Sequence, residues 1–140
     1  PMKPFEFTLQ RVLDYRRMVE EWAKNAYLET RIRRLEAEAE LAPIFEARSS
    51  ALVERPDSID RLLTLDRYLV RLDDQERDQR ALIAILVEEE ESARREWVER
   101  RKEAEALEKL RQSQFEEWVL ESEREEQRML DEWAVLRRAA

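Results

Sequence analysis

The densest group of side chains that could do chemistry is the run of four glutamates at residues 88–91. Several carboxylates can bind a divalent cation when their oxygens converge on one point. Here the surrounding pattern is helical, and consecutive helix residues point in different directions around the axis, so the four cannot converge. The run is therefore interpreted as a solvated charged surface and not as a metal site.

Other groups that catalysis uses are absent from the sequence. The chain contains no histidine and no cysteine, which excludes Ser-His-Asp and Cys-His arrangements and nitrogen or sulfur metal ligands. It also contains no glycine, so no glycine-rich loop is available to hold a phosphate. We expect a protein that is not an enzyme, has no catalytic residues, and binds no cofactor and no metal.

Charge and hydropathy restrict the partners. The formal net charge of −8 argues against nucleic acid, because phosphate binding requires a basic face. The longest apolar run, residues 81–87, is far shorter than the ~20 residues of a membrane span. The sequence has no cysteine for disulfides, and its N-terminus lacks the apolar core of a signal peptide. These features predict a cytoplasmic protein without direct membrane insertion.

One long helix, predicted over about residues 59–138, is the element that organises the chain. No proline follows Pro56, and apolar residues recur there at alternating steps of three and four. A period near 3.5 indicates a coiled coil. The predicted seam contains the apolar residues Leu65, Leu69, Leu72, Ile83, Leu86, Ala93, Trp97, Ala104, Leu107 and Trp118 and the polar residues Glu76, Gln79, Glu90, Arg100, Arg111 and Gln114.

A first helix is predicted over about residues 8–54, with Thr8 as N-cap and a kink at Pro43, where an amide donor is lost. Its predicted stripe contains Val12, Val19, Ala23, Ala26, Leu28, Ile32, Leu35, Ala39 and Ala42. A turn at about residues 55–58 follows, with Asp57 or Ser58 as cap of the second helix. The expected fold is all-α: a single coiled-coil domain over residues 1–140, forming an antiparallel two-helix coiled-coil hairpin with a long C-terminal overhang.

The turn also predicts a register and a monomer. It pairs Leu28 with the region of Leu86, so that residues 111–140 have no partner within the chain. This overhang carries apolar side chains, so either it frays or packs against a second copy, or it docks onto another protein. Trp97 and Trp22 are expected in the seam. Trp118 and Trp133 lie beyond it and are better candidates for an interface.

The motifs of the chain resemble the flagellar export protein FliJ family. The opening motif is Phe5-x-Phe7-x-Leu9-Gln10-x-Val12-Leu13-Asp14-x-Arg16. The second half adds residues 97–102, 107–110 and 125–134, which resemble the family's tryptophan-and-basic stretch, its Leu-Glu-Lys-Leu-like segment and its closing glutamine-acidic motif, in the right order. The resemblance covers nearly the whole chain. One departure is the net charge, which is more acidic than we expect for this family.

The resemblance implies a hairpin similar to the central shaft (gamma) subunit of rotary ATPases. It implies a cytoplasmic protein, peripheral to the membrane at the flagellar base, that takes part in type III protein export, and hence in motility. The joined chain ends would enter the flagellar export ATPase hexamer and promote its assembly and activity. Another part of the hairpin would contact the transmembrane export gate protein, and the chain would also bind export chaperones. The alternative is a self-associating structural coiled coil without a motor partner.

The expected contacts with the ATPase ring lie on both helices. On the first helix they are Leu9, Gln10, Leu13, Arg16 and Arg17; on the second they are Arg100, Arg101, Lys109, Arg111, Trp118, Gln127, Arg128 and Trp133. For each arginine the competing interpretation is a solvated side chain or an ion pair on its own helix, which is common on charged surfaces.

Overall fold

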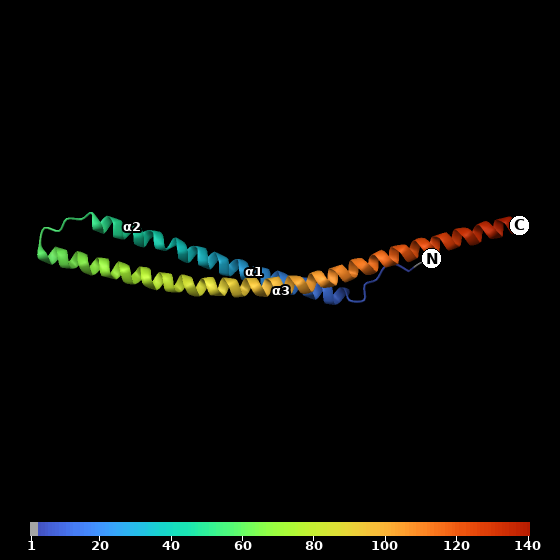
Figure 1. The fold of residues 1–140 in the computed structure, drawn as a ribbon, viewed down its shortest axis with the longest axis horizontal. Helices are drawn as coiled ribbons and strands as arrows, with labels where there is room; N and C mark the ends of the chain where they lie inside the picture. Colours follow the sequence, from blue (N-terminus) through green and yellow to red (C-terminus); the bar gives the residue numbers. More distant parts are fainter. Residues whose placement is uncertain (1–2) are drawn as a thin grey trace. The chain divides into compact units, whose positions relative to one another are not determined.

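The computed structural model describes residues 3–140, and every regular element in this range is an α-helix. The helices are α1 (Gln10–Ala39), α2 (Leu41–Leu52) and α3 (Ile59–Ala139). They form two compact units. The terminal unit contains the chain from its N-terminus to Glu21 together with Val98–Ala140, and the central unit is Trp22–Trp97. In each unit the early part of the chain runs antiparallel to α3 (Figure 1), so the predicted all-α hairpin is confirmed.

α3 runs without interruption for 81 residues because nothing in its sequence stops it. It contains neither glycine nor proline, the two residues that most weaken a helix interior. Ser58 caps its start, where the side-chain oxygen accepts a hydrogen bond of 3.2 Å from the amide of Arg61. Asp60 in the first turn and Arg137 and Arg138 in the last turn complement the helix dipole.

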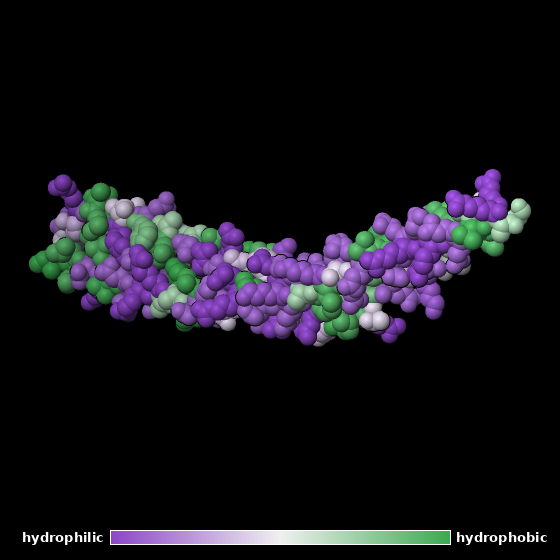
Figure 2. All heavy atoms as spheres, turned by 45° about the vertical axis from the view of Figure 1, so that its right-hand side comes forward, coloured by the Kyte–Doolittle hydropathy of each residue, from purple (hydrophilic) through white to green (hydrophobic). Residues whose placement is uncertain are grey.

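The face shown in Figure 2 is mostly hydrophilic, as expected for a chain in which 43% of the residues are charged. A pair of helices has little interior beyond the seam between them. Within residues 3–140 the buried apolar side chains are Phe7, Leu13, Ala37, Ala51, Leu72 and Ala104. The stability of the fold therefore depends on how the two faces of this seam match.

The first helical segment is interrupted at Glu40, three residues before the proline at which the sequence placed the kink. Proline has no amide hydrogen, and its ring displaces the carbonyl four residues earlier, which for Pro43 is that of Ala39. α1 consequently ends at Ala39. Pro43 itself lies in the first turn of α2, where the amide has no helical partner to lose. The proline thus acts one turn upstream of its own position.

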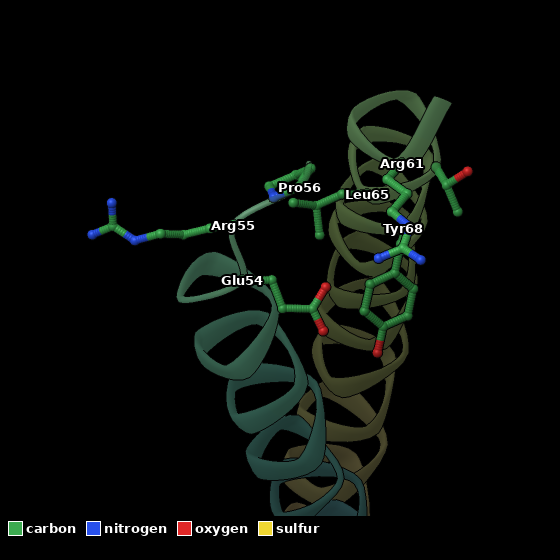
Figure 3. A pocket seen from close by; sticks show the side chains of 7 residues that line it. Glu54, Arg55, Pro56, Arg61, Leu65 and Tyr68 are labelled. Carbon is green, nitrogen blue, oxygen red and sulfur yellow. The ribbon is translucent and has the colours of Figure 1, made fainter. Parts of the chain in front are cut away.

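Residues 53–58 connect α2 to α3 and lie beside the first turns of α3 (Figure 3). Pro56 of this connection lies near Leu65, whereas Arg55 points away from the helix. The connection and α3 enclose an open hollow of about 600 Å³, to which Glu54 and Tyr68 also contribute. The start of α3 is therefore faced by the connection and not by α2.

This connection explains why the register of the hairpin in the central unit differs from the predicted one by about ten residues of α3, or nearly three helical turns. The sequence paired Leu28 with the region of Leu86. In the structure the neighbouring Tyr27 stacks on Trp97, with ring centroids 5.6 Å apart. The predicted pairing assumed that α2 faces the first residues of α3, a place that the connection occupies instead.

The predicted seam of α3 is confirmed. Every position assigned to it between Leu65 and Trp118, apolar or polar, is buried or half-buried in the structure. The polar positions contact α1 and α2, which together are called helix one below. In the central unit Glu76 forms an ion pair with Arg48, and Glu90 forms one with Arg34. Gln79 donates a hydrogen bond to the carbonyl of Ala37. The repeat of three and four was therefore sufficient to locate this face, including the layers without apolar side chains.

Helix one presents a different face to α3 from the one its apolar stripe predicted. Leu28, Ile32 and Leu35 are 39%, 56% and 48% exposed. The buried and half-buried positions of α1 and α2 include Leu13, Arg16, Glu20, Ala23, Tyr27, Thr30, Arg34, Ala37, Leu41, Ile44, Arg48 and Ala51. Of the predicted stripe, only Val19 and Ala23 are half-buried.

The polar layers of α3 account for this rotation of helix one. Arg34 forms an ion pair with Glu90, and the two side chains are only 20% and 15% exposed. Arg48 reaches Glu76 at 2.7 Å. Turning the apolar stripe inward would leave both carboxylates against aliphatic side chains, and a buried charge without a partner costs more than exposed leucines do. The hydrogen bond from Arg34 to Glu90, followed by the one to Glu38, raises the pKa of Arg34 above its ordinary value.

The structure places only one of the two tryptophans that were predicted to lie in the seam there. Trp97 lies in the seam as expected, half-buried against Tyr27. Trp22, which was also expected there, is 58% exposed. Because helix one is rotated, the aromatic residue that meets Trp97 is Tyr27 and not Trp22.

Replacing Trp97 by alanine should lower the melting temperature clearly. The change removes the stacked ring from the seam, which costs about 2–3 kcal/mol for an aromatic side chain that remains partly exposed. Trp22→Ala and Trp133→Ala, at positions that are 58% and 65% exposed, should change it little. Thermal unfolding followed by circular dichroism measures all three. An effect of Trp22→Ala equal to that of Trp97→Ala would contradict the observed rotation of helix one.

Acid should destabilise the central unit. The hydrogen bond from Arg94 lowers the pKa of Glu91 to about 2, and bonds from Arg80 and then Arg48 lower the pKa of Glu76. A carboxylate whose pKa is lower in the folded chain stabilises the fold above its unfolded pKa of about 4.3 and loses this contribution as the pH falls through the folded pKa. The melting temperature should therefore fall between about pH 5 and pH 2.

Glu76→Gln should make this acid-dependent fall smaller, because the variant has no carboxylate to protonate at that position. Glu89→Gln, at an exposed position of the same helix, is the control and should reproduce the wild-type profile. Melting curves recorded from pH 7 to pH 2 distinguish the two variants. Identical profiles for Glu76→Gln and the wild type would show that the bridged carboxylate does not contribute.

Candidate partner-binding site

All the residues that the sequence nominated as partner contacts lie in the terminal unit. Leu9, Gln10, Leu13, Arg16 and Arg17 belong to its first segment, and Arg100, Arg101, Lys109, Arg111, Trp118, Gln127, Arg128 and Trp133 belong to α3. The unit has two parts. In one, the N-terminal segment and α1 pack on α3; in the other, α3 continues alone.

An aromatic cluster fastens the N-terminal segment to α3. The ring of Phe5 packs edge-on against Phe115 at 5.2 Å and tilted against Trp118 at 6.1 Å. The indole nitrogen of Trp118 donates a hydrogen bond of 3.0 Å to the carbonyl of Lys3. Phe7 of the same segment is buried. Aromatic pairs of this kind stabilise a contact beyond the area that they bury.

The overhang consequently begins later than the sequence predicted. Residues after Leu110 were expected to have no partner in the chain, yet Phe115 and Trp118 contact the N-terminal segment. The reason is geometric, because extended chain advances about 3.3 Å per residue and a helix only about 1.5 Å. The few residues before α1 can therefore cover about three turns of α3. The unpartnered part of α3 is taken as residues 120–139, which are all exposed except the half-buried Ser122 and Glu125.

The candidates at the start of α1 differ in accessibility. Leu9 is 37% exposed, whereas Leu13 is fully buried in the seam. Gln10 accepts a hydrogen bond of 2.9 Å from Arg111 and donates one of 2.9 Å to Asp14. Leu13 is therefore a core residue that cannot reach a partner while the helices are paired, and Gln10 acts as part of the seam.

The arginines of α1 are engaged with α3. Arg16 pairs with Glu103 at 2.8 Å, and Arg17 pairs with Glu108 at 2.7 Å. Arg100 of α3 approaches the same Glu103 at 3.1 Å. These pairs join the two helices, but their side chains keep about a third to a half of their surface exposed, so their contribution to stability is modest.

A shallow hollow of about 330 Å³ lies beside these pairs. Arg17, Lys109 and Arg111 line it together with Glu105, Glu108 and Gln112. The guanidinium of Arg111 also lies 5.4 Å from the centre of the Phe5 ring. Both positive and negative groups line the hollow, which suits a charged protein surface better than a small anion.

The polar candidates further along α3 are bound within their own helix. Arg101 approaches Glu105 at 3.7 Å, and Arg128 pairs with Glu125 at 2.7 Å. Gln127 donates a hydrogen bond of 3.0 Å to Asp131. These are the ion pairs and hydrogen bonds that the competing interpretation predicted for a charged helix surface.

The last turns of α3 expose large apolar side chains that a partner could contact. Trp133, Val135 and Leu136 are 65%, 65% and 68% exposed. The guanidinium of Arg137 lies 5.6 Å from the centre of the Trp133 ring. Exposed apolar side chains concentrated on one helix mark a surface that another protein covers.

The glutamate run is only in part the solvated surface that the sequence predicted, because Glu88 and Glu89 are exposed whereas Glu90 and Glu91 are half-buried. Glu90 points to helix one and pairs with Arg34, while Glu91 pairs with Arg94 at 2.8 Å on its own helix. Within residues 3–140 no three histidine, cysteine or acidic side chains come together as metal ligands. In the same range no helix combines the length and apolar character needed to cross a membrane.

Sequence reasoning missed the residues that hold the terminal unit together. Phe5 and Phe115 were not nominated, nor were Glu103 and Glu108, the acidic partners of the α1 arginines. A signal for the first pair existed, because Phe5 and Phe7 alternate before α1 while Phe115 and Trp118 share one face of α3. The acidic partners carried no such signal among the many glutamates of the chain.

The sequence matches the family described as Flagellar FliJ protein over residues 5–139. No curated protein and no solved structure matches the chain. The family match includes the N-terminal segment, the hairpin and the unpartnered end of α3. It covers nearly the full length and agrees with the motifs at both ends of the chain. The chain therefore belongs to the flagellar FliJ family and is a component of the flagellar export apparatus.

Proposed function

We propose that this chain is the non-enzymatic central stalk of the flagellar export ATPase. Its terminal unit binds inside the ATPase hexamer and promotes assembly and activity of the ring. The rest of the hairpin links the ATPase to the transmembrane export gate and to export chaperones. The protein works in the cytoplasm, at the membrane-proximal base of the flagellum.

The observation that carries this proposal is the unpartnered end of α3. Residues 120–139 continue α3 beyond the aromatic cluster; all of them except Ser122 and Glu125 are exposed, and most of the apolar side chains are more than half exposed. Burying such side chains against another protein contributes about 25 cal/mol for each Å² removed from water. A single helix that enters a ring can make contacts on all sides. Such a position would cover the exposed apolar side chains of this helix.

The packed part of the terminal unit supports the same assignment. The N-terminal segment is held beside the start of residues 120–139, called the free helix below. Two sets of contacts hold it there: the aromatic cluster of Phe5, Phe115 and Trp118, and the ion pairs between α1 and α3. A stalk needs such a fixed base, because a flexible attachment would add an entropic cost to binding. The ring would then stabilise one arrangement of its subunits without any group of this chain contacting nucleotide.

The alternative of a structural coiled coil without a motor partner gains less from the structure. This alternative requires that the seam of α3 remains open for a second copy. That seam is filled by α1 and α2 of the same chain in the central unit, and by α1 and the N-terminal segment in the terminal unit. No vacant seam position of α3 before Val119 requires a second copy.

Ending the chain after Val119 should abolish stimulation of the ATPase. This truncation removes the free helix but keeps every contact of Phe115 and Trp118 with the N-terminal segment. The intact protein should raise phosphate release by the purified flagellar export ATPase in proportion to its concentration until the rings are saturated. The truncated protein should have no such effect, and circular dichroism should still show a cooperative melt.

Point variants give a control that does not shorten the chain. Trp133→Ala with Leu136→Ala removes two exposed apolar side chains from the free helix and should reduce the stimulation. Leu62→Ala with Leu63→Ala removes two side chains of similar exposure, 54% and 50%, from the other unit and should not. Full stimulation by the truncated protein would show that the free helix is not the docking element. No stimulation by the intact protein would remove the support for a stalk.

A further inference from the structure

The outer face of α1 in the central unit carries a second coiled-coil stripe that nothing in the chain covers. It consists of Asn25, Leu28, Ile32, Leu35 and Ala39, all of them exposed. Their spacing follows the same alternation of three and four residues as the seam, and they point away from α3. Three-four spacing on an exposed face is unusual, because solvent imposes no such repeat.

The residue types in this outer stripe fit one kind of partner. In heptad positions, Asn25, Ile32 and Ala39 occupy a, and Leu28 and Leu35 occupy d. A β-branched residue at a with leucine at d favours two parallel helices, and a single asparagine at a fixes their register. The partner that presents the same stripe is a second copy of α1.

The charges beside the outer stripe give the same orientation. Lys24 and Arg31 occupy g positions, and Glu29 and Glu36 occupy e positions. In a parallel pair each g residue meets the e residue five positions later on the other helix. Lys24 would then face Glu29 of the second copy, and Arg31 would face Glu36. An antiparallel pair would bring e positions together and place the glutamates against each other.

The groups involved are free to make these contacts. Glu29 pairs with Arg33 of its own helix at 3.1 Å, but both side chains are more than half exposed, so this pair is weak and can be exchanged. Tyr27, Thr30 and Arg34, which face α3, lie on the opposite side of α1. A second copy can therefore bind without opening the hairpin.

We propose that two copies of this chain associate in parallel through the outer stripes of their α1 helices. The contact is about 21 Å long, or two heptads. It falls at the small end of specific interfaces, below about 1,000 Å², which corresponds to a weak, concentration-dependent dimer. This association does not depend on the proposed binding to the ATPase.

Sedimentation equilibrium of the full-length protein over a range of concentrations tests the association. The wild type should show a reversible dimer, and Ile32→Lys should raise its dissociation constant about tenfold or more, because a charge would face its copy across the pair. Ile85→Lys is the matched control: Ile85 lies on α3 of the same unit and is 57% exposed, compared with 56% for Ile32. A wild-type monomer at every concentration up to about 1 mM would overturn the proposal.

Charge reversals test the pairing and leave the apolar stripe intact. Arg31→Glu and Glu36→Arg should each weaken the dimer about threefold or more, and the double variant should restore it, because the two charges are exchanged together. A double variant as weak as the single ones would show that residues 31 and 36 do not meet. Circular dichroism should give one melting curve for all of these variants, since none of the changes touches the seam.

A cysteine at position 25 reports the orientation directly, because the chain has no cysteine of its own. Asn25→Cys should form a disulfide-linked dimer under mild oxidation, whereas Ile85→Cys should not. In an antiparallel pair aligned on the two leucines, the cysteines would lie about 20 Å apart and could not join. Equal cross-linking of both variants would indicate random collisions and would overturn the proposal.

Discussion

Half-buried carboxylates on α3 are the constraint on which the rest of the fold depends. Glu76 and Glu90 lie at seam positions, where a charge is tolerated only beside an opposite charge. Arg48 and Arg34 supply those charges from helix one. Because both arginines must face α3, the rotation of helix one is fixed, and its apolar stripe is left in solvent.

The same constraint also selects one register. Sliding helix one by a heptad would keep the apolar spacing but would separate Arg34 from Glu90 and Arg16 from Glu103. Each misplaced pair would leave a partly desolvated charge without its partner. The wrong registers would therefore lose more folding free energy at these charges than their apolar layers could contribute. Apolar residues alone would not distinguish these registers, because the seam repeats every heptad.

An element could be predicted when its structure depends on its own sequence, and could not when it depends on residues elsewhere in the chain. The bounds and seam of α3 could be predicted because they depend only on the absence of glycine and proline and on one repeat. Helix one carries two stripes with the same period, and the choice between them depends on residues of α3, which a count of apolar positions ignores. The attachment of Phe5 to Phe115 was missed for a related reason, since an extended segment has no period that reveals its partner.

The polar layers within the seam and the apolar side chains outside the hairpin have different roles. Ion pairs such as that of Arg34 with Glu90 are specific, because a foreign helix without the matching charge would bury an unpaired group. The seam is therefore a poor site for adventitious partners. Apolar side chains such as Ile32 and Trp133 remain outside, where they can contribute binding energy. A family member that must contact other proteins along an exposed helix pair would need this arrangement, since a purely apolar seam would compete with those partners for the same side chains.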